Sequence, residues 1–246
     1  IEIFKKMGLP IFPVRALSGE IGGDISHEFH LKVQSGESEI FVDDSIFKTN
    51  FSKINTESLL DLESYTDDYF KSVKPSKNIK KYNSIELGHI FLFGTKYSES
   101  FDFNVDSEEG KFKPYMGSYG IGISRIPAAI IELFNDEKGI IWPKEISPFQ
   151  IVIINLINDN KFTKDFCDDL YSNLVSQKIE ALYDDRYERP GIKFADADLI
   201  GLPVQIIVGK NLINSNKITI KIRKTNKELE INTNELNEYI LKVFND

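Results

Sequence analysis

The chain has 246 residues, a length that favours two domains over one. It is 41% hydrophobic and has no apolar run near the roughly 18 residues of a membrane-spanning helix, which indicates a soluble protein. Its one cysteine, Cys167, excludes an internal disulfide and fits the reducing cytoplasm. Thirty basic against 38 acidic residues give a net charge of −8, which excludes a protein that coats nucleic acid through its overall charge.

The first part of the chain is predicted to begin with a helix and to continue with antiparallel strands. Apolar residues within 1–9 have helical spacing, whereas 10–17, 26–33 and 39–42 alternate or cluster β-branched and aromatic residues between glycine-containing turns. The chain starts at Ile1, without a methionine and inside a helical pattern. We therefore expect it to be a fragment of a longer protein.

Residues 43–84 are rich in Ser, Lys, Asn and Asp, and we interpret them as an excursion from the core with one helix over 56–73. The lysines near the end of this segment are expected to form a solvated surface. Strand patterns resume at 85–93 and 101–105. A glycine-rich stretch then leads into an apolar helical face over 121–133.

Beyond Pro148 the sequence alternates apolar strands with helices, as in an α/β domain. These elements are predicted at 150–156 (strand), 162–177 (helix), 181–183 (strand), 192–200 (helix) and 203–208 (strand). The strand runs have few polar interruptions, which suits strands buried on both faces. An alternation of Lys and Ile predicts an edge strand at 217–223, and 233–244 is predicted to be a closing helix. We place a domain boundary between residues 147 and 148.

Residues 117–125, with the sequence GSYGIGISR, join a strand to a helix through several glycines. Glycines allow a flat ligand to lie on bare backbone, a helix start offers free N–H groups, and Arg125 adds a planar cation that suits phosphate oxygens. A nucleoside triphosphate would fit such a place. Glycines at a helix start can also serve tight packing, so this motif alone leaves both interpretations open.

Several segments, in order along the chain, resemble one family of enzymes. Residues 117–125 resemble the third signature motif of class II aminoacyl-tRNA synthetases, in the form found in bacterial prolyl-tRNA synthetases. Residues 22–29 resemble the active-site strand that follows motif 2 in that family, and 86–91 with 94–99 resemble the strand before motif 3. Matches in the right order are more specific together than any one of them alone.

The resemblance implies a fold for each part of the chain. Residues 183–194 and 198–203 resemble the anticodon-binding domain of class IIa enzymes. The implied fold class is an α+β, antiparallel-sheet class II synthetase catalytic core, present in part over 1–147, followed by an α/β anticodon-binding domain with a mixed sheet over 148–246. Many relatives carry an editing domain where this chain has only its short polar insertion, 43–84. Such a short segment cannot bury a separate core, so we expect no editing of mischarged alanyl-tRNA.

The implied function is that of a proline–tRNA ligase, which activates proline with ATP to prolyl-adenylate and transfers it to tRNA-Pro. By resemblance, Arg125 would hold the γ-phosphate of ATP and act in catalysis together with His89. Gly120 and Gly122 would leave room for the adenosine. The residues implied at the proline site are His27, Glu28, His89, Phe91 and Ser118.

The expected partners are tRNA-Pro, proline and ATP, without DNA or a membrane, and the parent enzyme is expected to be a cytoplasmic homodimer formed through motif 1. The residues implied at the anticodon are Asp184, Asp185, Arg186, Arg189 and Lys193. Mg²⁺ is expected with ATP, but no permanently bound metal. His27 and His30, three residues apart on a strand, point to opposite faces, which argues against a metal site.

Motifs 1 and 2 are not found in this sequence. Because the motif 2 arginine would hold the α-phosphate, we expect the chain alone to be inactive. Two alternatives remain open: a synthetase-like module that binds RNA or a protein partner without catalysis, and another class IIa specificity, threonyl, histidyl or glycyl. Within that choice, His89 and Phe91 favour proline.

Overall fold

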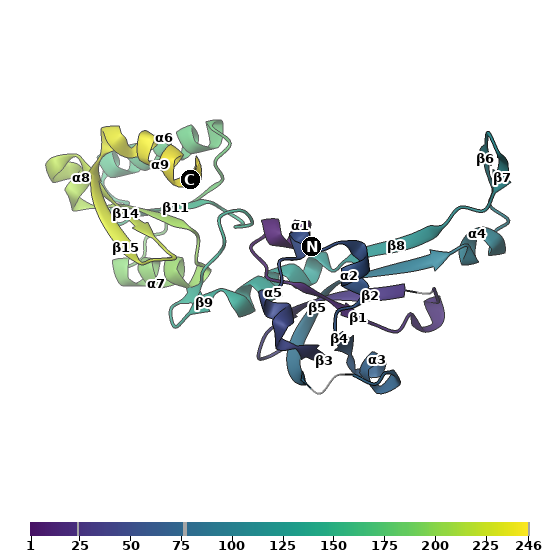
Figure 1. The fold of residues 1–246 in the computed structure, drawn as a ribbon. Coiled ribbons are helices and arrows are strands. Elements are labelled where there is room, and N and C mark those ends of the chain that lie inside the picture. Colours follow the sequence, from purple (N-terminus) through teal and green to yellow (C-terminus); the bar gives the residue numbers. More distant parts are fainter. Residues whose placement is uncertain (24, 76–77, 246) are drawn as a thin grey trace. The chain divides into compact units, whose positions relative to one another are not determined.

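The structure is a computed structural model that describes residues 1–23, 25–75 and 78–245 (Figure 1). The backbone divides into two compact units, Ile1–Leu133 and Phe134–Asp246. Among the described residues, no helix combines the length and the apolar character that crossing a membrane requires.

The first unit is built on a six-stranded sheet with the order β2-β1-β4-β3-β5-β8. Its strands are β1 (Phe12–Arg15), β2 (Ile25–Lys32), β3 (Ser38–Asp43), β4 (Ser64–Thr66), β5 (Ile79–Gly94) and β8 (Met116–Ile121). All pairs are antiparallel except β1 with β4. Because β2 also pairs with β5, five of the strands close into a ring around a core that contains Phe12, Val14, Ile40 and Val42. The predicted antiparallel strands are thus confirmed.

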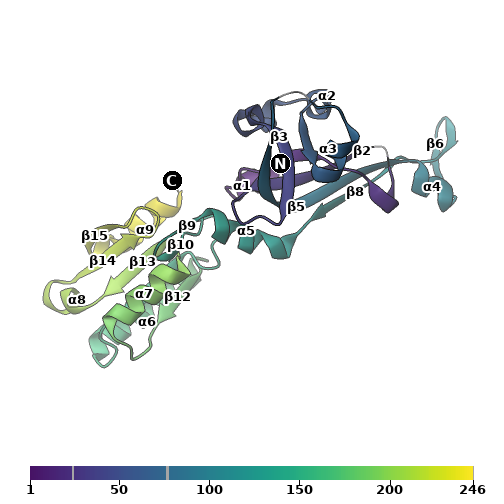
Figure 2. The same ribbon diagram turned by 90° about the horizontal axis from the view of Figure 1, so that it is seen from below.

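The helical elements of this unit are short. They are α1 (Glu2–Lys6), α2 (Thr56–Leu60), α3 (Asp67–Ser72), α4 (Lys96–Ser100) and α5 (Ile126–Leu133). The long strand β5 and the shorter β8 run side by side toward α4 and the hairpin of β6 (Val105–Ser107) and β7 (Gly110–Phe112) (Figure 2). A strand predicted at 101–105 is wrong, because the backbone turns there between α4 and β6.

The single helix predicted over 56–73 is also wrong. The strand β4 separates α2 from α3 and lies between β1 and β3 in the sheet, so this part of 43–84 belongs to the core rather than to an excursion from it. Ser64 and Tyr65 are buried, and the Ser64 hydroxyl donates to the Pro13 carbonyl at 2.9 Å. A strand of three residues depends on pairing with segments that are distant in the sequence. The local spacing of apolar residues therefore does not predict it.

The second unit contains a five-stranded sheet with the order β12-β11-β13-β14-β15. Its strands are β11 (Ile151–Asn155), β12 (Ala181–Asp184), β13 (Val204–Val208), β14 (Lys217–Ile222) and β15 (Lys227–Asn232). The first three in spatial order run parallel, and β14 and β15 are antiparallel to their neighbours, so the sheet is mixed. The predicted edge strand is wrong in its position, because β15 pairs outside β14.

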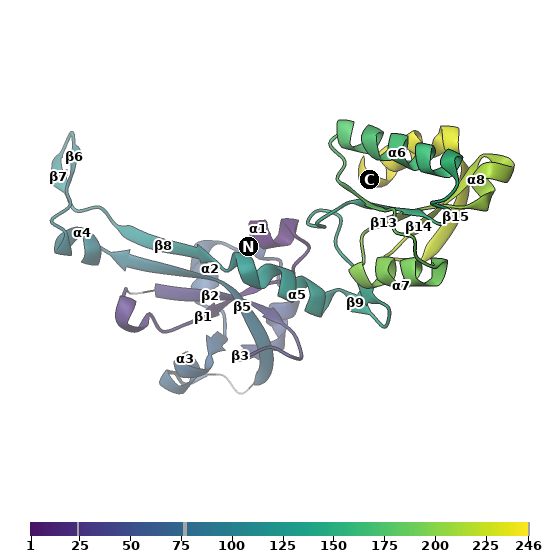
Figure 3. The ribbon, with the colours of Figure 1, turned by 180° about the vertical axis from the view of Figure 1, so that it is seen from behind.

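Helices cover both faces of this sheet. They are α6 (Lys161–Ser176), α7 (Pro190–Ile200), α8 (Lys210–Ser215), which the sequence did not predict, and α9 (Leu236–Asn245). Helices α6 and α9 lie on one face and α7 on the other (Figure 3). Alternate residues of β11 follow this division: Ile151 and Ile153 pack with α6 and α9, and Val152 and Ile154 pack with α7.

Residues 134–147, with the small hairpin of β9 (Asn135–Asp136) and β10 (Gly139–Ile140), pack on the second unit. The division therefore falls upstream of the predicted boundary between 147 and 148. Asp136 accepts two hydrogen bonds from the buried Arg223, at 2.8 and 2.6 Å, and the indole of Trp142 donates to the Ile200 carbonyl at 3.0 Å. Gly201 has φ of +77°, and a Cβ there would lie 1.8 Å from the Ile140 carbonyl oxygen, so only glycine fits.

Candidate functional site

One face of the strands β2, β5 and β8 gathers most of the predicted proline-site residues. In the sheet register Glu28 lies opposite His89 and Phe91 lies opposite Ser118. Cross-strand partners and residues two apart on a strand share a face, so these four side chains lie on the same side. The His89 and Phe91 rings stack, with centroids 4.0 Å apart.

His27 does not join this group. It precedes Glu28 on β2 and faces the other side of the sheet, where it lines a cavity of about 320 Å³ with Pro13 and Phe29, which Phe91 also borders. Burial lowers the pKa of His27, and the charges of Arg15 and His89 lower it further. Its Nε2 atom has no hydrogen-bond partner among the described residues. His27 thus lies on the opposite face from Glu28, His89 and Ser118 and shares a cavity with Phe91 alone among the predicted proline-site residues.

A β-bulge in β5 brings Glu86 to the face that carries Glu28 and His89. No role was predicted for Glu86 from the sequence. Phe29 pairs with Gly88 and the next residue of β2, His30, pairs with Glu86, so β5 carries one extra residue. Residues three apart on a regular strand face opposite sides, but the bulge turns Glu86 to the same side as His89. One Glu86 oxygen lies 3.4 Å from His89 Nδ1, and the other accepts from Arg125 Nη1 at 3.0 Å.

Hydrogen bonds fix the histidine and the carboxylates of this face. His89 Nε2 lies 2.6 Å from the Ser26 hydroxyl, and His30 bonds Glu28 at 2.7 Å. The hydrogen bond with His89, helped by the one with Arg125, holds the pKa of Glu86 below its usual range against the effect of burial. Glu28, Glu86 and His89 each offer one ligand atom within 4.8 Å of the others, so a divalent cation could be held here. His30 thus lies on the face of Glu28, and His27 lies on the other face of β2, as their separation of three residues predicts.

Arg125 lies at the end of the short turn between β8 and α5 with about half of its side chain exposed. Its Nη1 donates to the Glu86 backbone carbonyl as well as to the carboxylate, both at 3.0 Å, which leaves the rest of the guanidinium for a ligand. A Cβ at Gly120 would meet no heavy atom nearer than 3.6 Å, so packing does not require glycine there. Arg125 and Gly120 thus leave accessible space next to the His89 face.

The residues predicted at the anticodon lie at the end of β12 and the start of α7, but two of the basic ones are occupied within the protein. Arg186 donates to Asp184 at 2.9 Å through two nitrogens and to Asp196 at 2.8 Å. Lys193 is 1% exposed, and its ammonium donates to the carbonyls of Asn155 and Asp184 at 2.6 and 3.0 Å. Burial lowers the pKa of Lys193, although Asp184 opposes this shift. The side chain of Lys193 is therefore not accessible to RNA in this structure, contrary to the prediction that it lies at the anticodon.

The loop between β12 and α7 presents other groups to solvent. Asp185 and Arg189 are exposed, and Tyr187 is 81% exposed. The Asn158 amide donates to the backbone carbonyls of Asp185 and Arg186 at 2.7 and 2.5 Å, which fixes the loop. Tyr187 was not among the predicted residues, although an aromatic residue between charged loop residues is itself a signal of RNA contact.

Comparisons with known proteins match both units. Residues 150–243 match the family described as the anticodon binding domain. The chain is 43% identical over 243 residues to a proline–tRNA ligase of Wolbachia sp. subsp. Brugia malayi, covering 97% of this chain and 56% of that protein. It is 41% identical to the proline–tRNA ligase of Bartonella bacilliformis, covering 92% of this chain and 55% of that protein. The chain thus spans just over half the length of these relatives.

The fold has a match among solved structures. It aligns with a crystal structure of prolyl-tRNA synthetase from Cryptosporidium parvum complexed with L-proline and AMP, with a TM-score of 0.69. That alignment covers 98% of this chain and 44% of the other, at 18% sequence identity. At this identity the likeness concerns the fold alone.

Proposed function

Because this chain is a homologue of bacterial prolyl-tRNA synthetases along nearly its whole length, we propose that it forms part of a proline–tRNA ligase. Such an enzyme activates proline with ATP, releases diphosphate and transfers the prolyl group to tRNA-Pro. One observation carries the proposal: four of the predicted proline-site residues share one face of the sheet, and Arg125 lies beside it. These four residues are Glu28, His89, Phe91 and Ser118.

The geometry of this face suits a small cyclic amino acid next to a nucleotide. The stacked His89 and Phe91 rings offer an aromatic wall beside which the pyrrolidine ring would pack, and Ser118 lies opposite Phe91 on the neighbouring strand. The open surface above Gly120 would accept the adenosine, and Arg125 would keep its contact with Glu86 through Nη1 and bind a phosphate with its other nitrogens. Mg²⁺ carried in by ATP would neutralise phosphate charge, and Glu28 and Glu86 are the carboxylates nearest to hold it.

Activation also needs a positive group at the α-phosphate, where charge develops during attack by the proline carboxylate. Arg15 cannot supply it on this face, because it pairs across the strand with His27 and its guanidinium lies over the Tyr69 ring at 5.0 Å. We therefore expect the chain alone to show no proline-dependent exchange of diphosphate into ATP. Saturable exchange by the purified chain would contradict this part of the proposal.

The second unit would bind the anticodon of tRNA-Pro through the loop between β12 and α7. Asp185, Tyr187 and Arg189 are exposed groups that would contact RNA, and the half-exposed Arg186 and the buried Lys193 would hold the loop in position. Protein modules that read single-stranded RNA commonly stack unpaired bases on aromatic side chains and bond their exposed edges. Tyr187 is the residue of this loop that offers such a ring.

Binding of tRNA by the whole chain tests the function directly. We expect the chain to bind tRNA-Pro more tightly than the tRNAs for threonine, histidine and glycine in a competition filter-binding assay at fixed salt. Equal affinity for all four tRNAs would contradict specificity for proline tRNA. Preference for one of the other three would favour the corresponding specificity instead.

Replacing Tyr187 with alanine is expected to weaken the binding of tRNA-Pro by a factor between about 5 and about 150, because loss of one base-stacking contact costs about 1–3 kcal/mol. Tyr187→Phe keeps the ring and is expected to bind nearly as well as the unchanged chain. Tyr115→Ala is the matched control, since Tyr115 is 80% exposed and lies in the first unit. If Tyr187→Ala binds tRNA as tightly as Tyr115→Ala, the stacking role is wrong.

A further inference from the structure

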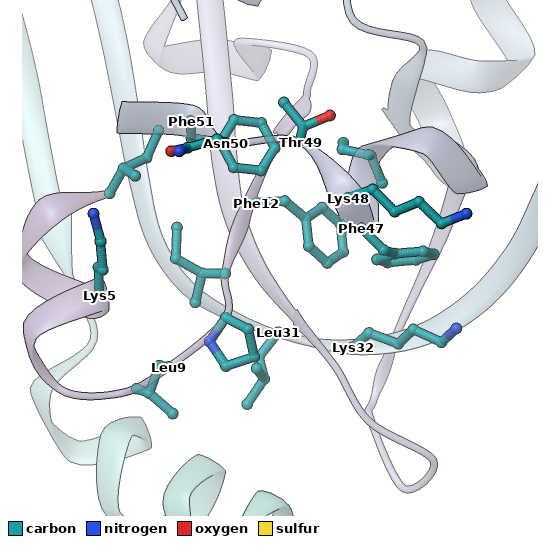
Figure 4. Close-up of a pocket in the computed structure, with 14 residues that line it drawn as sticks. Lys5, Leu9, Phe12, Leu31, Lys32, Phe47, Lys48, Thr49, Asn50 and Phe51 are labelled. Carbon is teal, nitrogen blue, oxygen red and sulfur yellow. The ribbon is translucent and has the colours of Figure 1, made fainter. Parts of the chain in front are cut away.

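A cavity of about 700 Å³ lies in the first unit among α1, the start of β1, the end of β2 and residues 46–51 (Figure 4). Its floor is apolar: Leu9, Phe12, Leu31 and Ile46 are each no more than 3% exposed. The volume falls within the roughly 300–1,000 Å³ of small-molecule sites. None of its lining residues belongs to the candidate site described above.

The rim of this cavity is positively charged. Lys5, Lys32 and Lys48 line it, and none of its described lining residues is acidic, although Glu2 outside the lining pairs with Lys5 at 3.9 Å. Figure 4 shows the ends of Lys32 and Lys48 on either side of the Phe47 ring. The Lys32 ammonium lies 3.6 Å from the centre of the Tyr82 ring and 4.3 Å from that of Phe47, so two aromatic faces hold it at the rim.

The walls offer few other polar groups. Besides the lysines, the lining residues with polar side chains are Thr49 and Asn50. A sugar, a nucleotide or a peptide would bring many polar atoms that lose their water here without gaining partners. A hydrocarbon body with one anionic end matches both the apolar floor and the cationic rim.

We propose that this cavity binds an amphipathic carboxylate, a ligand with an aliphatic chain and a single carboxylate group. The aliphatic chain of the ligand lies on Leu9, Phe12 and Leu31, and its carboxylate lies at the rim next to the ammonium group of Lys48. This site is independent of the proposed ligase function, because it shares no residue with it.

Isothermal titration of the whole 246-residue chain with saturated carboxylates from hexanoate to decanoate, each below its micellar concentration, tests the proposal. We expect saturable binding at one site that tightens about fourfold with each added methylene group. Octanoate is expected to bind about fivefold more tightly than the uncharged 1-octanol, because only the carboxylate gains from the lysines. Absence of saturable binding, or equal affinity for octanoate and octanol, would overturn the proposal.

Charge reversal at the rim separates this site from general hydrophobic adsorption. Lys48→Glu is expected to weaken octanoate binding fivefold or more and to leave octanol binding unchanged. Lys53→Glu is the matched control, because Lys53 is an equally exposed lysine five residues further on that does not line the cavity. Equal effects of the two substitutions on octanoate binding would show that the rim lysine does not contact the carboxylate, and the proposal would fail.

Discussion

Replacing Asp136 with asparagine is expected to lower the free energy of unfolding of the second unit by about 3 kcal/mol. Arg223 is fully buried, and its two terminal nitrogens donate to the two Asp136 oxygens at 2.8 and 2.6 Å. Asparagine keeps the size of the side chain but leaves the guanidinium charge buried without a counter-charge. Removing one partner of a buried ion pair costs about 3–5 kcal/mol, and partial exposure of Asp136 places the expected effect at the lower end.

The chain provides its own probe for this measurement. Trp142 is its only tryptophan, and its indole donates to the Ile200 carbonyl in the second unit, so fluorescence during urea unfolding follows that unit. Asp169→Asn is the matched control, because Asp169 is an exposed carboxylate on α6. We expect the free energy of unfolding of Asp169→Asn to lie within about 0.5 kcal/mol of that of the unchanged chain. A similar result for Asp136→Asn would show that the Arg223 pair does not hold residues 134–147 on the second unit.

The stabilisation by this ion pair also has a defined pH dependence. The hydrogen bonds from Arg223 hold the pKa of Asp136 far below its usual range. A carboxyl group with a lowered folded-state pKa contributes stability that is complete above its unfolded pKa, about 3.9, and is lost as the pH falls toward the folded value. The difference in stability between the unchanged chain and Asp136→Asn is therefore expected to be constant above about pH 5 and to shrink by pH 3. If the difference in stability between the two chains stays constant down to pH 3, the stabilisation does not come from the ionised carboxylate of Asp136.

Local sequence patterns correctly predicted the elements in which contacts with distant segments do not disturb the regular spacing of apolar residues. The strands β11, β12 and β13 are short apolar runs between turns, and each appears within two residues of its predicted bounds. The shared face of His89 and Phe91 follows from their separation of two on one strand. The opposite faces of His27 and Glu28 follow from the same rule, but the resemblance grouped these two residues by sequence adjacency.

The features that the sequence did not predict depend on contacts between distant segments. Glu86 reaches His89 only because β5 bulges against β2, and a bulge changes the face of every residue on one side of it. Lys193 can be buried because two backbone carbonyls, at the ends of β11 and β12, accept hydrogen bonds from its ammonium group. Its spacing of four from the buried Ala197 was the available signal that this lysine lies on the inner face of α7.

Replacing Glu86 with glutamine is expected to lower kcat/KM for ATP in proline activation about a hundredfold in the complete ligase of which we propose this chain is a part. Glu86 positions two groups at once, since one oxygen meets His89 Nδ1 and the other accepts from Arg125. Glutamine has one acceptor oxygen and an amide that only donates, so either His89 or Arg125 loses its partner. A misplaced Arg125 would meet the phosphates poorly, and the loss of one positioned donor alone costs about 10²–10³ in rate in related chemistry.

Exchange of labelled diphosphate into ATP, measured against proline and ATP concentration, gives the result. Glu39→Gln is the matched control: Glu39 also lies on the sheet of the first unit and pairs with Lys81 at 2.5 Å, but both side chains are about half exposed. Such a surface pair contributes at most about 1 kcal/mol to stability and does not contact the candidate site, so we expect its exchange rate to stay within about twofold of the unchanged enzyme. If Glu86→Gln behaves like Glu39→Gln, the bulge in β5 is a feature of the sheet alone, and Arg125 is oriented for ATP by other groups.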